Sequence, residues 1–207
     1  MPQPATFFNV DVECTATVPS MGYLLTVGIV PVVHSLSKGW VLHRDRLYVR
    51  LDHGIDALTI PRPAHYTSMP WWVEQSDEAQ DEAYRDESLV RVPPSLAARM
   101  IVEFVEQVQP DWSQRFFTAN PVSFDKPWLD DLFAHYNMPS PFHYRSLCLR
   151  SMKFGMDPSK GFGNSREAHD PGQREQQQDA GSHGEGQTQN AGALALCLGQ
   201  TADQNGD

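Results

Sequence analysis

A run of eleven residues constrains the fold more than any other part of the chain. Residues 23–33 read YLLTVGIVPVV, which is apolar almost throughout. The length of the run and its β-branched residues predict a strand, and the lack of polar alternation predicts that both of its faces are covered. Such a strand needs other structure on both sides, so the run indicates a sheet inside a layered domain.

Two further strands flank this run. Residues 7–13 carry aromatic and β-branched side chains, and residues 40–51 alternate in polarity and include several basic side chains. Turns at residues 19–20 and 37–39 join the three segments. We therefore expect an antiparallel meander of three strands, with the third strand nearer an edge.

After residue 70, predicted helices alternate with short predicted strands. The clearest helix follows Pro93-Pro94 and repeats apolar residues at helical spacing. We predict an α/β fold, a mixed sheet flanked by helices, in one domain spanning residues 5–170. A low-complexity tail, predicted to be disordered, follows at residues 171–207. The remaining expected elements are helices at 70–87, 95–108 and 124–136, a buried strand at 116–119, and a last strand from 142 that runs into a short helix near 149.

Charge and composition narrow the class of protein. The formal net charge is -10, which does not suit a protein that coats nucleic acid through many phosphate contacts. An enzyme that binds only a strand end through metal ions tolerates an acidic surface. The N-terminus lacks the pattern of a signal peptide, and no stretch approaches the roughly 20 apolar residues of a membrane span. The chain is therefore expected to be cytoplasmic and to have no membrane partner.

Three carboxylates stand at positions that suit metal chemistry. Asp11 and Glu13 are two residues apart on a predicted core strand, so both side chains leave the same face. Burial of two neighbouring carboxylates without a counter-charge is costly, and a divalent cation removes that conflict. Asp125 adds a third carboxylate at a strand-to-helix junction. The alternatives are a strand end that reaches solvent, for the first two, and a residue favoured by the helix dipole, for Asp125.

The order of these motifs resembles a known superfamily. A strand with Asp-x-Glu, two more strands, helices and then Asn120-x-x-x-Phe124-Asp125 is similar to the DnaQ-like DEDD 3'-5' exonucleases, of the DEDDh type. The block from Trp71-Trp72 to Ala79, with the pattern Trp-Trp-x-x-Gln-Ser-x-Glu-Ala, looks like the branch of phage exonucleases and the mycobacterial-type 3'-5' exoribonuclease. The resemblance covers roughly residues 6–165.

The resemblance implies an RNase H-like exonuclease fold and a two-metal site. Two Mg²⁺ or Mn²⁺ ions are expected to act on the 3' end of RNA or DNA, with Asp11, Glu13 and Asp125 as ligands. One of the two tryptophans is expected to pack in the core and the other, taken as Trp72, to lie near the nucleotide. The other residues implied to contact the substrate are Cys14, Thr15, Asn120 and Phe124.

The third motif of this family, His-x-x-x-x-Asp, is missing after residue 140. The nearest register runs from Arg174 to Asp179, and an arginine cannot accept a proton near neutral pH. Asp179 is therefore the candidate for the last metal ligand, and the nearby His169 is the candidate general base.

Several explanations of this gap stay open. His169 can serve as the base from a remodelled loop, the chain can be an impaired relative that binds nucleic acid or a partner without turnover, or the C-terminus can be altered. A metal-dependent hydrolase of a small phosphate ester is a further alternative. The sequence leaves open the preference for RNA or DNA, and also the oligomeric state.

Overall fold

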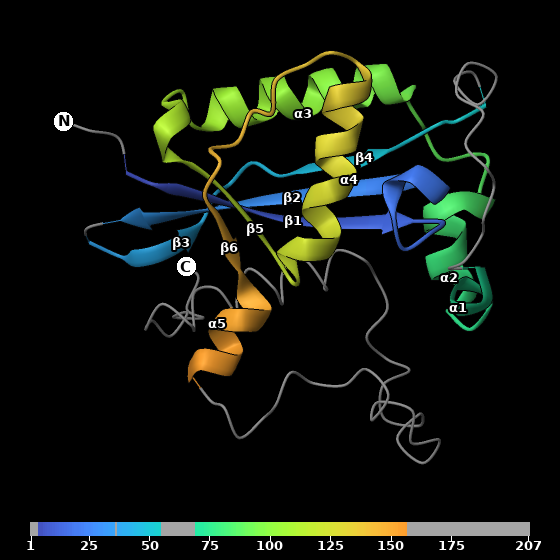
Figure 1. Ribbon diagram of the computed structural model, residues 1–207, viewed down its shortest axis with the longest axis horizontal. Coiled ribbons are helices and arrows are strands. Elements are labelled where there is room, and N and C mark those ends of the chain that lie inside the picture. Colours follow the sequence, from blue (N-terminus) through green and yellow to red (C-terminus); the bar gives the residue numbers. More distant parts are fainter. Residues whose placement is uncertain (1–3, 36, 55–68, 157–207) are drawn as a thin grey trace.

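The computed structural model describes residues 4–35, 37–54 and 69–156. In this part of the chain, six strands form a mixed sheet with the order β3-β2-β1-β5-β6, and β4 also pairs with β2 (Figure 1). The strands are β1 (Thr6–Cys14), β2 (Leu24–Ser35), β3 (Gly39–Leu42), β4 (Leu47–Arg50), β5 (Arg115–Ala119) and β6 (Ser146–Cys148).

Strand β2 is the apolar run from which the fold was predicted. It pairs antiparallel with β1, β3 and β4, as the meander predicts. β5 and β6 then extend the sheet on the other side of β1 and run parallel to it. The predicted fold class, an α/β fold with a mixed sheet and flanking helices, is confirmed.

The third predicted strand, residues 40–51, is divided in two. β3 pairs with the C-terminal end of β2 at Val32–Ser35, whereas β4 pairs with Thr26–Ile29. Pro31 lies between these two ladders and has no N–H to donate, although its carbonyl accepts from His43 N–H at 2.8 Å. The missing donor and the exposed residues 44–46 explain why the strand breaks there.

Helices pack on both faces of the sheet. The main core packs α3 (Pro94–Val108) and α4 (Val122–His135) against β1, β2 and β5. On the opposite face, α5 (Leu149–Met156) packs with Phe7 and Trp40 in a smaller core. Figure 1 shows α4 crossing in front of the strands, α3 running along their upper side, and α5 following β6.

The helix predicted at residues 70–87 is broken into three pieces. They are α1 (Met69–Val73), α2 (Asp77–Gln80) and a single π-helical turn, η3 (Asp81–Arg85). The break falls at Ser76, whose hydroxyl accepts from Ala79 N–H at 3.2 Å and begins α2 as an N-cap.

The alternation of β1 decides which way its acidic residues face. Phe8, Val10 and Val12 are buried in the main core under α3 and α4. Asp11 and Glu13 alternate with them and therefore point to the opposite face of the sheet. That is the face on which α5 lies, so the fold keeps both carboxylates out of the main core.

The predicted boundary at residue 170 and the tail at 171–207 lie outside the described residues. None of the helices in the described ranges combines the length and the apolar character that crossing a lipid bilayer requires.

Candidate active site

Three carboxylates gather at the C-terminal end of β1. Asp11 and Glu13 stand on this strand, and Asp125 lies in the first turn of α4. The parallel ladder between β1 and β5 ends at Asn9, and beyond it the described residues provide no strand partner on that side of β1. There, Val12 N–H donates a hydrogen bond to Oδ1 of Asp125 across 3.2 Å. The third carboxylate is thereby bound to the residue that separates the other two.

These carboxylates shift one another's pKa because they lie close together in a partly buried region. Burial, followed by the charges of Asp11 and Asp125, raises the pKa of Glu13 from 4.5 to about 8. Burial and then the charge of Asp11 raise the pKa of Asp125 from 3.8 to about 8. The hydrogen bond from Val12 and the charge of Arg150 on α5 act against that rise. The negative charges of the three carboxylates therefore repel one another, and a bound cation would offset this repulsion.

The chemistry of this donor set fits a hard divalent cation. Mg²⁺ and Mn²⁺ prefer carboxylate oxygens, and a metal ion favours the ionised form of Glu13 and Asp125. Within the described ranges, no group of three or more His, Cys, Asp or Glu side chains already has an arrangement that could hold a metal ion. The resemblance adds Asp179 to the ligands, and that residue and the candidate base His169 both lie outside the described residues.

A β-bulge follows Glu13 and is held by Trp72. The pairing of β1 with β2 shifts register between Glu13 and Cys14. The carbonyl of Cys14 accepts a hydrogen bond of 3.0 Å from Nε1 of Trp72. Bulges next to active sites commonly aim a side chain in a required direction. The geometry at the end of β1 thus depends on a residue 58 positions away in the sequence.

The burial of Trp72 corrects one prediction. Its side chain is 0% exposed and packs with Leu25 and Ala83, so the ring has no face free for a nucleotide. Trp71 is 51% exposed and meets Trp72 edge-on, with ring centroids 5.0 Å apart. The expectation that one tryptophan packs in the core is met by Trp72, the one that had been assigned to the substrate.

The residues that follow Glu13 are tied into the loop before β2. The Cys14 thiol is buried and donates to the carbonyl of Ala16 at 3.0 Å, and burial raises its pKa to about 12. Thr15 is also buried, and its hydroxyl accepts from Tyr23 N–H at 2.8 Å. Both side chains are thus used in contacts within this loop, and their role in binding a nucleotide stays a prediction.

Asn120 and Phe124 frame Asp125 from the loop and first turn of α4. Asn120 follows β5 directly, is half-buried, and precedes Pro121 through a cis peptide bond. Phe124 is half-buried and packs against the main core. Both residues therefore lie on the segment that carries Asp125, and their contact with a nucleotide stays a prediction.

The face of the sheet that carries Asp11 and Glu13 continues across β2 to β4, which the sequence did not predict. Glu13 on β1 pairs with Thr26 on β2, which pairs with Arg50 on β4. Directly paired residues of antiparallel strands share a face of the sheet. A cationic side chain therefore stands on the carboxylate face, two strands from Glu13. The basic residues at 44, 46 and 50 were a signal, but only the register identifies Arg50 as the one on this face.

A comparison with family models identifies the family of this chain. A family model described as the 3'-5' exoribonuclease Rv2179c-like domain matches residues 6–193, which is most of the chain. A search of curated protein sequences found none that matches this chain.

Among solved structures, the exonuclease I of E. coli matches this chain over part of its length. Its zinc-bound complex with single-stranded DNA gives a TM-score of 0.47 at 12% identity, over 77% of this chain and 31% of that chain. Its complex with a 5cy-dA13 oligonucleotide gives 0.43 at 11% identity, over 76% and 31%. The chain spans about a third of the length of these exonuclease chains.

Proposed function

This chain belongs to the Rv2179c-like 3'-5' exoribonuclease domain family, and on that premise we propose that it hydrolyses single nucleotides from the 3' end of an RNA strand. The observation that carries the proposal is the hydrogen bond between Val12 N–H and Asp125, because it joins a carboxylate of α4 to the Asp-x-Glu strand. A cluster of one buried and two half-buried carboxylates suits an enzyme that binds phosphate through cations.

In this proposal Asp11, Glu13 and Asp125 hold two divalent cations, Mg²⁺ or Mn²⁺. When bound, these ions would supply Lewis-acid stabilisation of the charge that develops on the phosphate. The position of Asp125 in the first turn of α4 favours its ionised form through the helix dipole. Asp125 is buried and both Asp11 and Glu13 are half-buried, and this partial burial strengthens the charge interactions among them.

The remaining roles are assigned through the family resemblance. His169 would accept the proton of the attacking water, and Asp179 would complete the ligand set. Trp72 acts indirectly, since it holds the Cys14 carbonyl and with it the bulge that follows Glu13. The backbone of Cys14 and Thr15, together with Asn120 and Phe124, would contact the terminal nucleotide.

The first experiment replaces each carboxylate by its neutral isostere. Asp11→Asn, Glu13→Gln and Asp125→Asn should each lower kcat/KM on a 5'-labelled oligoribonucleotide by at least about 100-fold, because each removes charge that a cation needs. Asp130→Asn is the matched control, since it lies on the same helix with its side chain 46% exposed. Full activity in all three isosteric variants would refute the assignment of the site.

A further inference from the structure

Two rows of paired residues extend from the carboxylates across the sheet. Glu13 pairs with Thr26 and then Arg50, and in the next row Asp11 pairs with Gly28 and then Tyr48. All of these side chains share one face. Neighbouring strands are about 4.8 Å apart, so Arg50 stands about 10 Å from Glu13 across the sheet.

Arg50 is incompletely partnered in the described part of the chain. Its Nη2 forms an ion pair with Glu82, and its guanidinium lies 4.8 Å from the ring centroid of Tyr48. Its Nε is buried and has no hydrogen-bond partner among the described residues. The Tyr48 hydroxyl is buried near Thr26 and Glu82 but makes no hydrogen bond of ordinary geometry there. Two donors therefore lie close together without a full set of acceptors.

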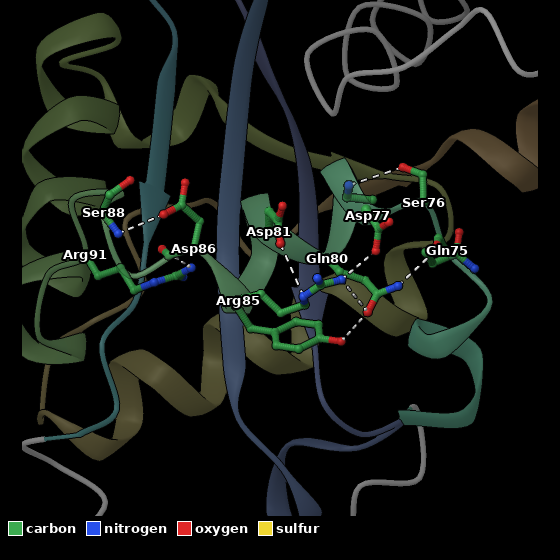
Figure 2. A network of polar contacts seen from close by, with 11 residues as sticks. Gln75, Ser76, Asp77, Gln80, Asp81, Arg85, Asp86, Ser88 and Arg91 are labelled. Carbon is green, nitrogen blue, oxygen red and sulfur yellow. Dashed lines mark hydrogen bonds and ion pairs between the residues drawn. The ribbon is translucent and has the colours of Figure 1, made fainter.

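Glu82, the partner of Arg50, lies on η3. Ion pairs stabilise this turn, because Arg85 binds Asp77 at 2.7 Å and Asp81 at 3.2 Å (Figure 2). Beyond η3, residues 91–92 lie along the open edge of β4, where Val92 N–H donates to the Arg50 carbonyl at 2.9 Å. Glu82 therefore lies beside β4 and supplies the counter-charge of Arg50.

We propose that Arg50 and Tyr48 form a subsite for a phosphate group of the bound strand, one or two nucleotides upstream of the one removed, and that Glu82 occupies Arg50 until the strand binds. This inference rests on the proposed function. A guanidinium binds phosphate best through two parallel N–H groups, and Glu82 uses one side of that fork while Nε remains unpaired.

The position and the charge of the subsite both favour a strand phosphate. The carboxylate cluster would take the scissile phosphate through cations, and the next phosphates of an extended strand continue away from it. Thr26 and Gly28 are the residues between the two ends of the rows, and both are small. In a chain of net charge -10, a cation on this face gives the polyanionic strand a second point of attachment.

The first test measures binding without turnover. The affinity of a 5'-fluorescein pentaribonucleotide is measured by anisotropy in EDTA at several NaCl concentrations. Arg50→Gln should weaken binding about 10-fold and reduce the slope of log K against log salt by about 0.7, the value for one phosphate contact on a single strand. Arg44→Gln removes the same charge from a side chain that is 94% exposed, and should change neither quantity. Equal affinity and slope in Arg50→Gln and the unmodified protein would overturn the subsite.

The second test compares substrate lengths. With Mn²⁺, Arg50→Gln should lose at least about 10-fold more kcat/KM on the pentanucleotide than on a dinucleotide, which is too short to reach the subsite. An equal loss on both lengths would show that Arg50 acts on the carboxylates instead. If the unmodified protein cleaves neither substrate, the exonuclease proposal fails, while the binding comparison still decides the subsite.

Two conservative variants separate positioning from contact. Arg50→Lys keeps the charge but not the fork, so it should restore the salt slope without the full affinity. Glu82→Gln should bind the pentanucleotide about 2- to 5-fold more tightly, because it removes the competitor. Weaker binding by Glu82→Gln would contradict the competition and assign Glu82 to holding Arg50 in place. If Arg50→Gln does not melt cooperatively, Arg50→Lys and Tyr48→Phe replace it in the comparison of pentanucleotide and dinucleotide. An equal change in kcat/KM on both substrates in these two variants would overturn the proposal.

Discussion

Adjacent tryptophans with unlike surroundings show how a single residue controls the end of β1. Trp72 is enclosed and donates its indole N–H to the Cys14 carbonyl, while Trp71 beside it is half exposed. The Cys14 carbonyl comes at the bulge, where the ladder with β2 shifts register. Loss of the indole N–H would leave the Cys14 carbonyl without its hydrogen-bond donor. The backbone of Cys14, which follows Glu13, would then be held less firmly.

Trp72→Phe should therefore cost about 1–3 kcal/mol in the free energy of unfolding, since it leaves a buried carbonyl unpaired and also removes ring volume. Trp71→Phe, at the exposed neighbour, should stay within about 0.5 kcal/mol. Urea denaturation followed by far-UV circular dichroism measures both. Equal free energies for the two variants would show that the hydrogen bond to Cys14 contributes nothing.

At the same scale, the sequence could predict some site residues and not others. Asp11 and Glu13 follow from their spacing on a strand, and Asp125 from its place after a buried strand. The contact that unites them, from Val12 to Asp125, joins residues 113 positions apart and has no local signal. Local sequence also does not indicate which tryptophan is buried, because the burial of Trp72 depends on Leu25 and Ala83, which are distant in the sequence.

At the scale of elements, the sheet and its two main helices followed from apolar periodicity. The meander, α3, β5 and α4 were all expected near their observed bounds. The two failures have identifiable causes. Strand 40–51 divides where Pro31 cannot donate, and helix 70–87 breaks where Ser76 caps a new start. Both signals were in the sequence, but they act across strands or against an otherwise continuous pattern.

The divided strand matters for the site. Because β4 pairs with Thr26–Ile29 and not with the far end of β2, it lies alongside the part of the sheet that carries Asp11 and Glu13. The broken helix leaves η3 beside β4, where Glu82 meets Arg50. π-helical turns are frequent at functional sites. The elements that deviate from simple prediction are thus the ones that build the lateral part of the face.

At the scale of the whole molecule, the carboxylate cluster should make stability depend on pH and on metal. In the folded chain the pKa values of Glu13 and Asp125 are raised to about 8, from 4.5 and 3.8. Between about pH 4 and pH 8 the folded state therefore holds protons that the unfolded chain has released. The free energy of unfolding must fall as the pH rises through that window.

The melting temperature of the metal-free protein should accordingly decrease from pH 5.5 to pH 8. Mg²⁺ or Mn²⁺ binds the ionised carboxylates, so it should raise the melting temperature more at pH 8 than at pH 5.5. The double variant Glu13→Gln, Asp125→Asn should show little of either effect. A metal-induced stabilisation that is the same in the double variant would place the cation elsewhere.

The central claim is that the chain shortens RNA from its 3' end, and the most direct measurement follows the products of one defined strand. A 5'-labelled oligoribonucleotide with a free 3'-hydroxyl is incubated with Mn²⁺ and the fragments are resolved by mass over time. We predict a ladder that shortens by one nucleotide at a time with release of nucleoside 5'-monophosphates, and protection of the same strand by a 3'-phosphate. Internal fragments at the earliest times, or equal cleavage of the blocked strand, would contradict the account.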